Sequence, residues 1–144
     1  MHKLGIGTLA VFVATVVLLA AHPAPAVRIG NAAGDTVTVQ MIGSSAGYSF
    51  KPSMVRIKAG QSVKFVTVSG GPHNITFDPQ DIPEGAAPTL DADMPRQQAK
   101  LTGPLVPNPD DAYVITFKDA KPGAYKFYCL PHQSLGMQGT IIVE

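Results

Sequence analysis

Hydrophobic and polar residues alternate in short stretches along most of the chain from residue 37 onward. The apolar positions are Val37, Val39 and Met41; Val55 and Ile57; Val63 and Phe65; Ile75 and Phe77; Tyr113, Ile115 and Phe117; and Tyr125, Phe127 and Cys129. A period of two with many β-branched and aromatic residues indicates strands that bury one face. Turn signals separate the stretches at Ala59-Gly60, Gly70-Gly71 and Lys121-Pro122-Gly123. The pattern predicts an all-β fold, an antiparallel Greek-key β-sandwich of about seven to eight strands.

The interval from Asp78 to Asp111 breaks this alternation and contains seven prolines. Connections of this length in compact domains tend to be functional or irregular excursions from the scaffold. We expect one short helix of one or two turns in this interval, between Met94 and Leu101.

The first 26 residues follow a different pattern, with Lys3, an apolar run from Leu4 to Ala21, and then Ala24-Pro25-Ala26. These are the charged region, apolar region and A-x-A site of a secretory signal peptide. We therefore predict a signal peptide at residues 1–26 and one mature domain at 27–144, a monomer that is not inserted in a membrane. The alternative is an uncleaved anchor, because such a run is near the lower limit for spanning a bilayer.

The charge of the chain changes the picture mainly by exclusion. It has 11 Lys plus Arg and 10 Asp plus Glu, so the mature region, which lacks Lys3, has ten of each sign. The mature region has no excess of basic residues, which would be expected of a protein that binds nucleic acid or an anionic membrane surface. A modest acidic patch is expected where five carboxylates follow one another without an intervening Lys or Arg, namely Asp78, Asp81, Glu84, Asp91 and Asp93.

The single cysteine lies in "YCLPHQSLGM", residues 128–137, where Cys129, His132 and Met137 have the spacing C-x2-H-x4-M between two predicted strands. An exported protein with one cysteine cannot form an internal disulfide, so its thiol is available to another molecule or to a metal. The other histidine of the mature region is His73 in "GGPHNITF", beside a turn at the start of another strand. If His73 and Cys129 lie on neighbouring strands, the four side chains meet at one end of the sandwich.

Two imidazoles, a thiolate and a nearby thioether form a blue-copper ligand set. Copper alternates between a soft reduced ion, Cu(I), and a harder oxidised ion, Cu(II), and this set of donors accommodates both. Pro131 contributes by fixing the backbone φ just before His132. The pattern predicts one copper ion bound by this set.

Each residue also has a structural interpretation. Cys129 continues an alternation and is compatible with a small buried hydrophobe, and Met137 is compatible with a residue that fills a gap in the core. His73 beside a turn is compatible with a surface or capping histidine. A nucleophilic Cys-His pair needs an orienting group and an oxyanion site, and structural zinc prefers four Cys or His ligands. The joint occurrence of the residues favours copper, and we do not expect an enzyme.

The chain resembles the plastocyanins, within the wider cupredoxin family. The resemblance covers nearly all of the mature region and is carried by "YSFKPSMVRIKAGQSVKFV", "GPHNITFDPQDIPEG" and "PGAYKFYCLPHQSLGMQGTIIVE". It implies a cupredoxin-like sandwich in which His73, Cys129, His132 and Met137 bind copper. It also implies that the backbone of Asn74 hydrogen-bonds toward the thiolate sulfur.

The resemblance implies a function as well. Plastocyanins are soluble one-electron carriers of the thylakoid lumen that transiently bind cytochrome f, their electron donor, and photosystem I, their acceptor, and they are not enzymes. Two contact surfaces are implied: an apolar end formed by Pro72, Pro131, His132 and Leu135, and an exposed Tyr128 beside the acidic residues Asp78 and Asp81. The simple signal peptide fits a cyanobacterial thylakoid lumen, and a periplasm is the alternative.

Two other functions stay open at this point. A periplasmic cupredoxin of the pseudoazurin kind shares the C-x2-H-x4-M spacing but donates electrons to a reductase. A copper storage or delivery protein would hand over the metal itself, although such sites usually expose several Met, His or Cys residues in a labile arrangement. Arg96 and Lys100 follow the acidic residues, so electrostatic steering of partners should be weaker than in strongly acidic plant members.

Overall fold

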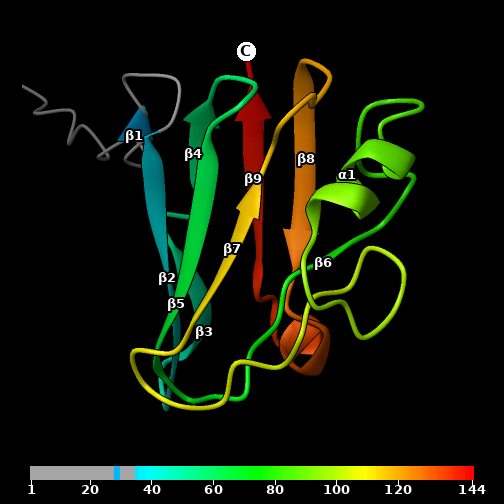
Figure 1. Ribbon diagram of the computed structural model, residues 1–144. Helices are drawn as coiled ribbons and strands as arrows, with labels where there is room; N and C mark the ends of the chain where they lie inside the picture. Colours follow the sequence, from blue (N-terminus) through cyan, green and yellow to red (C-terminus); the bar gives the residue numbers. More distant parts are fainter. Residues whose placement is uncertain (1–27, 30–34) are drawn as a thin grey trace, which may run out of the picture.

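The computed structural model describes residues 28–29 and 35–144, in which two β-sheets pack face to face (Figure 1). One sheet has the strand order β1-β4-β9-β8-β6 and the other β3-β2-β5-β7. The strands are β1 Arg28–Ile29, β2 Thr36–Ser44, β3 Gly47–Lys51, β4 Met54–Ile57, β5 Ser62–Ser69, β6 Thr76–Phe77, β7 Ala112–Thr116, β8 Gly123–Tyr128 and β9 Gln138–Val143. The predicted signal peptide, residues 1–26, lies outside the described residues.

The alternation in the sequence corresponds to the two faces of the strands. In β2, Val37, Val39 and Met41 are buried, and the residues between and beside them are exposed or half-exposed. In β8, Tyr125 and Phe127 are buried between exposed or half-exposed residues. The predicted β-sandwich is confirmed, and the described residues form nine strands because β1 and β6, of two residues each, add to the longer ones.

The sheets are mixed, and the expectation of antiparallel pairing throughout was wrong. β2 runs parallel to β5, and β4 runs parallel to both β1 and β9. The reason is that consecutive strands change sheets: β4 and β5 follow each other in the chain but belong to different layers. Alternation reports which side of a strand is buried, and it carries no information about the direction of the neighbouring strand.

An aromatic cluster joins the two sheets. The ring of Phe127 on β8 lies 4.8 Å from that of Phe50 on β3 and 5.3 Å from that of Phe65 on β5, measured between centroids, and both pairs meet edge to face. Gly139, its cross-strand partner on β9, leaves room for the ring, since a Cβ there would lie 2.5 Å from Cζ of Phe127. These geometries are favourable for aromatic rings, and they fix β8 two residues before Cys129.

The proline-rich interval contains the short helix at a different place from the one expected. Helix α1 spans Ala87–Asp93, with Pro88 in its first turn, and Met94–Leu101 forms turns instead. Proline suits the first turn because its missing N–H has no partner there in any helix. The carboxylate of Asp91 accepts hydrogen bonds from the side chain of Gln97 and the backbone of Leu101, both at 2.8 Å. This carboxylate folds the following segment back onto the helix.

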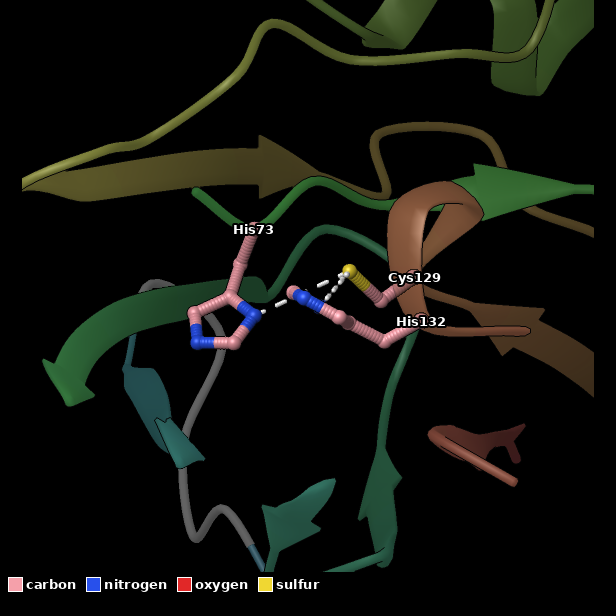
Figure 2. Close-up of side chains that lie close together, drawn as sticks. All are labelled: His73, Cys129 and His132. Atoms are coloured by element: carbon pink, nitrogen blue, oxygen red, sulfur yellow. Dashed lines mark hydrogen bonds between the residues drawn. The ribbon is translucent and has the colours of Figure 1, made fainter. Parts of the chain in front are cut away.

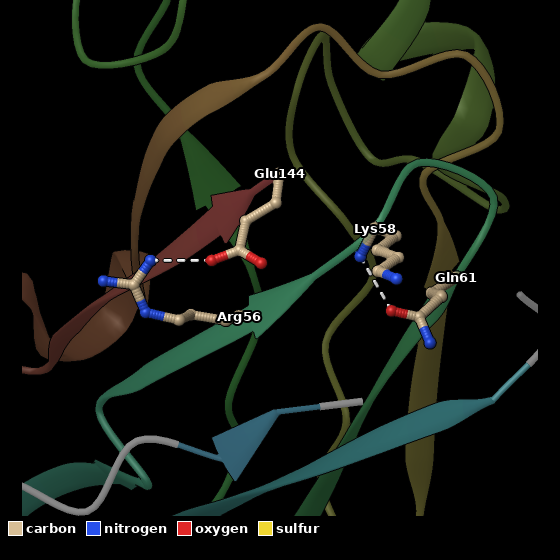
Figure 3. A network of polar contacts seen from close by, with 4 residues as sticks. All are labelled: Arg56, Lys58, Gln61 and Glu144. Carbon is tan, nitrogen blue, oxygen red and sulfur yellow. Dashed lines mark hydrogen bonds and ion pairs between the residues drawn. The ribbon is translucent and has the colours of Figure 1, made fainter. Parts of the chain in front are cut away.

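The end of the sandwich near the C-terminus is closed by polar contacts (Figure 3). Arg56 pairs with Glu144 at 2.9 Å, and the Lys58 backbone N–H donates to the Gln61 side chain at 2.7 Å in the turn between β4 and β5. The loop after β8 lies at the opposite end (Figure 1). Within the described part of the chain, no helix is long and apolar enough to cross a membrane.

Tyr113 on β7 carries a buried hydroxyl in the core. The residue is 0% exposed, and its hydroxyl has no hydrogen-bond partner among the described residues. Burial raises the pKa of Tyr113 from 10.0 to about 12, and the positive charge of Arg96 opposes this only in part. The folded state therefore resists ionisation of this phenol.

We predict that Tyr113→Phe makes the protein less sensitive to alkaline pH. Above pH 10 the unfolded chain releases the Tyr113 proton while the folded chain keeps it, so unfolding becomes more favourable as pH rises toward 12. The native protein should lose about 2 kcal/mol more stability than the variant over this interval. Urea unfolding of the metal-free proteins at several pH values measures the difference, and parallel curves would contradict the prediction.

Candidate metal centre

One loop carries three of the predicted site residues. Cys129 follows β8, His132 lies in a 3-10 helix, η1, at Leu130–Leu135, and Met137 precedes β9. Three backbone hydrogen bonds close the loop: Cys129 N–H to Met137 C=O at 3.0 Å, Met137 N–H to His132 C=O at 3.3 Å, and His132 N–H to Cys129 C=O at 3.1 Å. Pro131 is the second residue of η1 and is exposed. The backbone thus fixes the order and spacing of the three side chains.

His73 reaches the same place from the end of β5. Gly71 passes so close to Pro107 that a Cβ on this glycine would lie 2.4 Å from the carbonyl oxygen. His73 then exchanges two backbone hydrogen bonds with Val106, at 3.2 and 2.7 Å. The side chain of His73 is 0% exposed, so this imidazole is held inside the molecule.

The three donor atoms surround a common point (Figure 2). The sulfur of Cys129 lies 3.7 Å from Nδ1 of His73 and 3.4 Å from Nδ1 of His132. All three donor atoms lie within 4.8 Å of one another. An ion bound to nitrogen and sulfur at about 2.0–2.3 Å with tetrahedral angles would separate its donors by about 3.5 Å. The two distances to the sulfur therefore match the spacing that a single ion requires.

The tautomer of His73 is set by its outer nitrogen. Nε2 of His73 lies 2.8 Å from the backbone carbonyl of Ser69, which can only accept a hydrogen bond. Nε2 must carry the proton, so Nδ1 keeps its lone pair and faces the sulfur. Metal-binding histidines are commonly oriented by such a contact.

Cys129 is fully buried, and burial raises the pKa of its thiol. Hydrogen bonds from the backbone of Asn74 and of His132 oppose this rise in the pKa of Cys129. Burial also lowers the pKa of His132, with a smaller contribution from the nearby His73. A neutral imidazole is the form that binds metals, and a bound cation would favour the thiolate.

Met137 completes the arrangement of a type 1 copper site. It is 0% exposed, and its backbone is hydrogen-bonded to both Cys129 and His132. Its thioether sulfur would supply a weak additional ligand to an ion held by the other three donors.

The side chain of Asn74 links the two loops that carry the donors. Asn74 is 1% exposed, and its Oδ1 accepts a hydrogen bond of 2.8 Å from the backbone N–H of Leu130. Asn74 follows His73 in the chain and Leu130 follows Cys129, so this bond holds together the neighbours of two donors. Sequence reasoning assigned a role to the backbone of Asn74 and missed the role of its side chain.

Two further residues at the site were not predicted. The ring of Tyr48 on β3 stacks on that of His132, with centroids 3.9 Å apart and planes inclined by 17°. Ser69 provides the carbonyl that orients His73. The sequence signal for Tyr48 is weak: an aromatic residue two positions before the buried Phe50 is also typical of an ordinary core residue. Ser69 acts through its backbone, which no side-chain pattern can indicate.

The predicted partner surfaces differ in character. Around His132, Leu135 is 57% exposed, Leu130 is 52% exposed, and Pro72 is exposed, so the end of the molecule is apolar. Tyr128 on β8 is half-buried. Asp78 and Asp81 are exposed, but Asp81 is paired with Lys126 at 3.1 Å. The carboxylate charge on that side is therefore partly neutralised.

The comparisons with known proteins identify the family. The family model described as copper-binding proteins of the plastocyanin/azurin family matches residues 37–144. The chain belongs to this family. A plastocyanin from Scenedesmus fuscus is 39% identical over 108 residues, which make up 75% of this chain and 99% of that protein. A plastocyanin from the cyanobacterium Prochlorothrix hollandica is 36% identical over 138 residues, 95% of this chain and 88% of that protein.

A solved structure agrees with these relatives. The oxidized form of plastocyanin from Dryopteris crassirhizoma is similar with a TM-score of 0.56 and 31% identity, over 75% of this chain and 100% of that chain. Membership of the family, together with the donor set described above, makes this chain a type 1 copper protein that carries electrons.

We predict that Asn74→Ala lowers the stability of the protein by removing the hydrogen bond between the two loops that carry the donors. The variant leaves the buried N–H of Leu130 without an acceptor, which typically costs about 1–3 kcal/mol. Urea unfolding of the metal-free protein measures the loss, and amide hydrogen exchange of Leu130 should accelerate. The amide of Lys126 on β8, which donates a hydrogen bond of 3.0 Å to the backbone carbonyl of Asp81, is the internal control. Equal protection of Leu130 in both proteins would show that the contact is dispensable.

Proposed function

We propose that this protein shuttles single electrons from cytochrome f to photosystem I and is not an enzyme in its own right. The observation that carries the proposal is the enclosed cluster of three donor atoms within 4.8 Å, whose outer imidazole, His132, lies at an apolar end of the molecule. A bound copper ion supplies a one-electron couple. We assign its ligands to His73, Cys129, His132 and Met137.

The chain's own residues suit repeated electron transfer because contacts within the protein hold them in place. His73 is fixed by the Ser69 carbonyl and by burial, and Cys129 is fixed by backbone hydrogen bonds at the end of β8. Groups that are already in place rearrange little when the charge of a site changes. Among the described residues, His73, Cys129 and His132 are the only His, Cys, Asp or Glu side chains grouped closely enough to hold a metal.

The apolar end suits transient contact. Leu130 and Leu135 are exposed on the same short helix as His132, so a partner that covers this helix would approach the outer imidazole. Small interfaces with few charges bind weakly and release quickly, as a carrier requires. Tyr128, Asp78 and Asp81 form the second contact surface, and the Asp81–Lys126 pair makes its steering weak.

We further infer an export signal at residues 1–26, one copper-binding domain at 27–144, and a thylakoid lumen as the compartment. The pattern of the first 26 residues and the similarity to the plastocyanin of a cyanobacterium support this location. A periplasmic carrier of the pseudoazurin kind is the alternative, and the plastocyanin relatives favour the first assignment.

We predict that Cys129→Ser abolishes the intense blue colour of the copper-loaded protein. The colour of a type 1 site comes from charge transfer between thiolate sulfur and copper, and serine cannot provide it. Visible absorption and electron paramagnetic resonance of the loaded proteins measure the effect. A variant that remained blue would remove Cys129 from the site.

We predict that the copper-loaded mature protein re-reduces flash-oxidised photosystem I in a fast, saturable reaction that the Cys129→Ser variant does not support. Because the acidic surface is partly neutralised, the rate should fall only about twofold to threefold between low and physiological salt. Transient absorption of the photosystem measures both properties. A blue protein that does not react would point to a periplasmic reductase, and rapid loss of copper to a chelator would point to metal delivery.

A further inference from the structure

The two histidines of the site are held by different means. His73 is fully buried, and a hydrogen bond from Nε2 to Ser69 orients its ring. His132 is half-buried on the short η1 helix, and the contacts described for its ring are the Cys129 sulfur, the edge of His73, and the face of Tyr48. The outer imidazole is thus oriented by stacking where the inner one is oriented by a hydrogen bond.

The ring of Tyr48 is positioned in turn by its cross-strand neighbour on β2. Tyr48 on β3 lies opposite Gly43 on β2, and a Cβ at Gly43 would approach Cε1 of the tyrosine to 2.4 Å. The missing side chain of Gly43 therefore leaves the space that the ring occupies. The carbonyl of Gly43 also accepts a hydrogen bond of 2.9 Å from the hydroxyl of Ser69. Gly43 therefore contacts both Tyr48, which stacks on His132, and Ser69, which hydrogen-bonds to His73.

We propose that Tyr48 is a positioning residue for His132, a role that rests on the proposed copper site. Nearly parallel rings with centroids 3.9 Å apart restrict rotation of the imidazole about its side-chain torsions. The stack keeps Nδ1 of His132 directed at the interior, 3.4 Å from the sulfur. It also replaces, with an apolar ring face, the water that would otherwise compete at this half-exposed ligand. Tyr48 thereby slows detachment of His132 and release of copper.

The experiment compares Tyr48→Leu, which keeps an apolar side chain but removes the ring, with Tyr48→Phe, which keeps the ring and removes the hydroxyl. Copper release from each loaded protein to an excess of a strong chelator is followed by loss of the blue absorption. Aromatic pairing of this kind corresponds to about two- to tenfold in a rate or equilibrium. We expect Tyr48→Leu to release copper faster by about that factor, and Tyr48→Phe to stay within about twofold of the native rate.

A second readout needs no copper. In the metal-free protein, the face of the Tyr48 ring should shift the nuclear magnetic resonances of the His132 ring protons upfield, and this shift should persist in Tyr48→Phe and vanish in Tyr48→Leu. Val114→Ala, which truncates a 38% exposed apolar residue on β7, is the control for general surface effects.

The outcomes separate the two proposals. If the native protein takes up one copper and turns blue, but Tyr48→Leu and Tyr48→Phe release it at the same rate, the positioning role is wrong and the copper site stands. If the native protein does not form a blue centre, the proposed function fails first. Faster release from Tyr48→Leu with unchanged release from Tyr48→Phe and Val114→Ala would establish the role.

Discussion

The hydrogen bond between the Asn74 side chain and the Leu130 backbone N–H is the contact on which the geometry of the site depends most directly. The donors come from two loops. His73 lies in the loop from β5 to β6, Cys129 follows β8, and β6 pairs with β8 in one sheet. In addition to this strand pairing, the side chain of Asn74 connects the residues directly after His73 and Cys129, where a small displacement would change the spacing of the donors most.

The rest of the fold holds the two ends of this connection. On the β8 side, Phe127 packs edge to face against Phe50 and Phe65 of the opposite sheet, directly below Cys129. On the β5 side, the backbone of His73 is paired with Val106, which also accepts a hydrogen bond of 2.9 Å from the buried Thr67 hydroxyl. Close-packed interiors of this kind have low compressibility, so they hold the ends of the loops at fixed positions. The donor side chains thus lie on or beside loops, and the packed sandwich fixes where those loops begin and end.

The sequence predicted what depends on side-chain chemistry and periodicity. Alternation identified the buried faces of the strands, and the spacing around Cys129 indicated the loop and the metal. It did not predict the parallel pairing of β2 with β5, because direction is decided by where the chain changes sheets. The helix was expected after Met94 and lies before it; the carboxylate of Asp91, a tertiary contact, folds the later segment into turns. Tyr48 escaped notice because its partner is 84 residues away in the chain, from 48 to 132.

The two histidines differ in burial, so the site has an enclosed side at His73 and a more accessible side at His132. His73 is enclosed by the protein, whereas His132 is half-buried, with Tyr48 stacked on its ring and the exposed Leu130 and Leu135 on the same short helix. A partner that covers the apolar end would therefore meet one ligand edge, and would approach the site by the shortest path through the protein. The half-exposed His132 is also more accessible to water than the buried His73. The contacts described for its ring include no counterpart of the hydrogen bond between His73 and Ser69. An electron carrier needs an accessible ligand and a retained metal at once, and an aromatic face beside the outer imidazole reconciles the two, since it blocks one side of the ring while leaving its edge open to a partner.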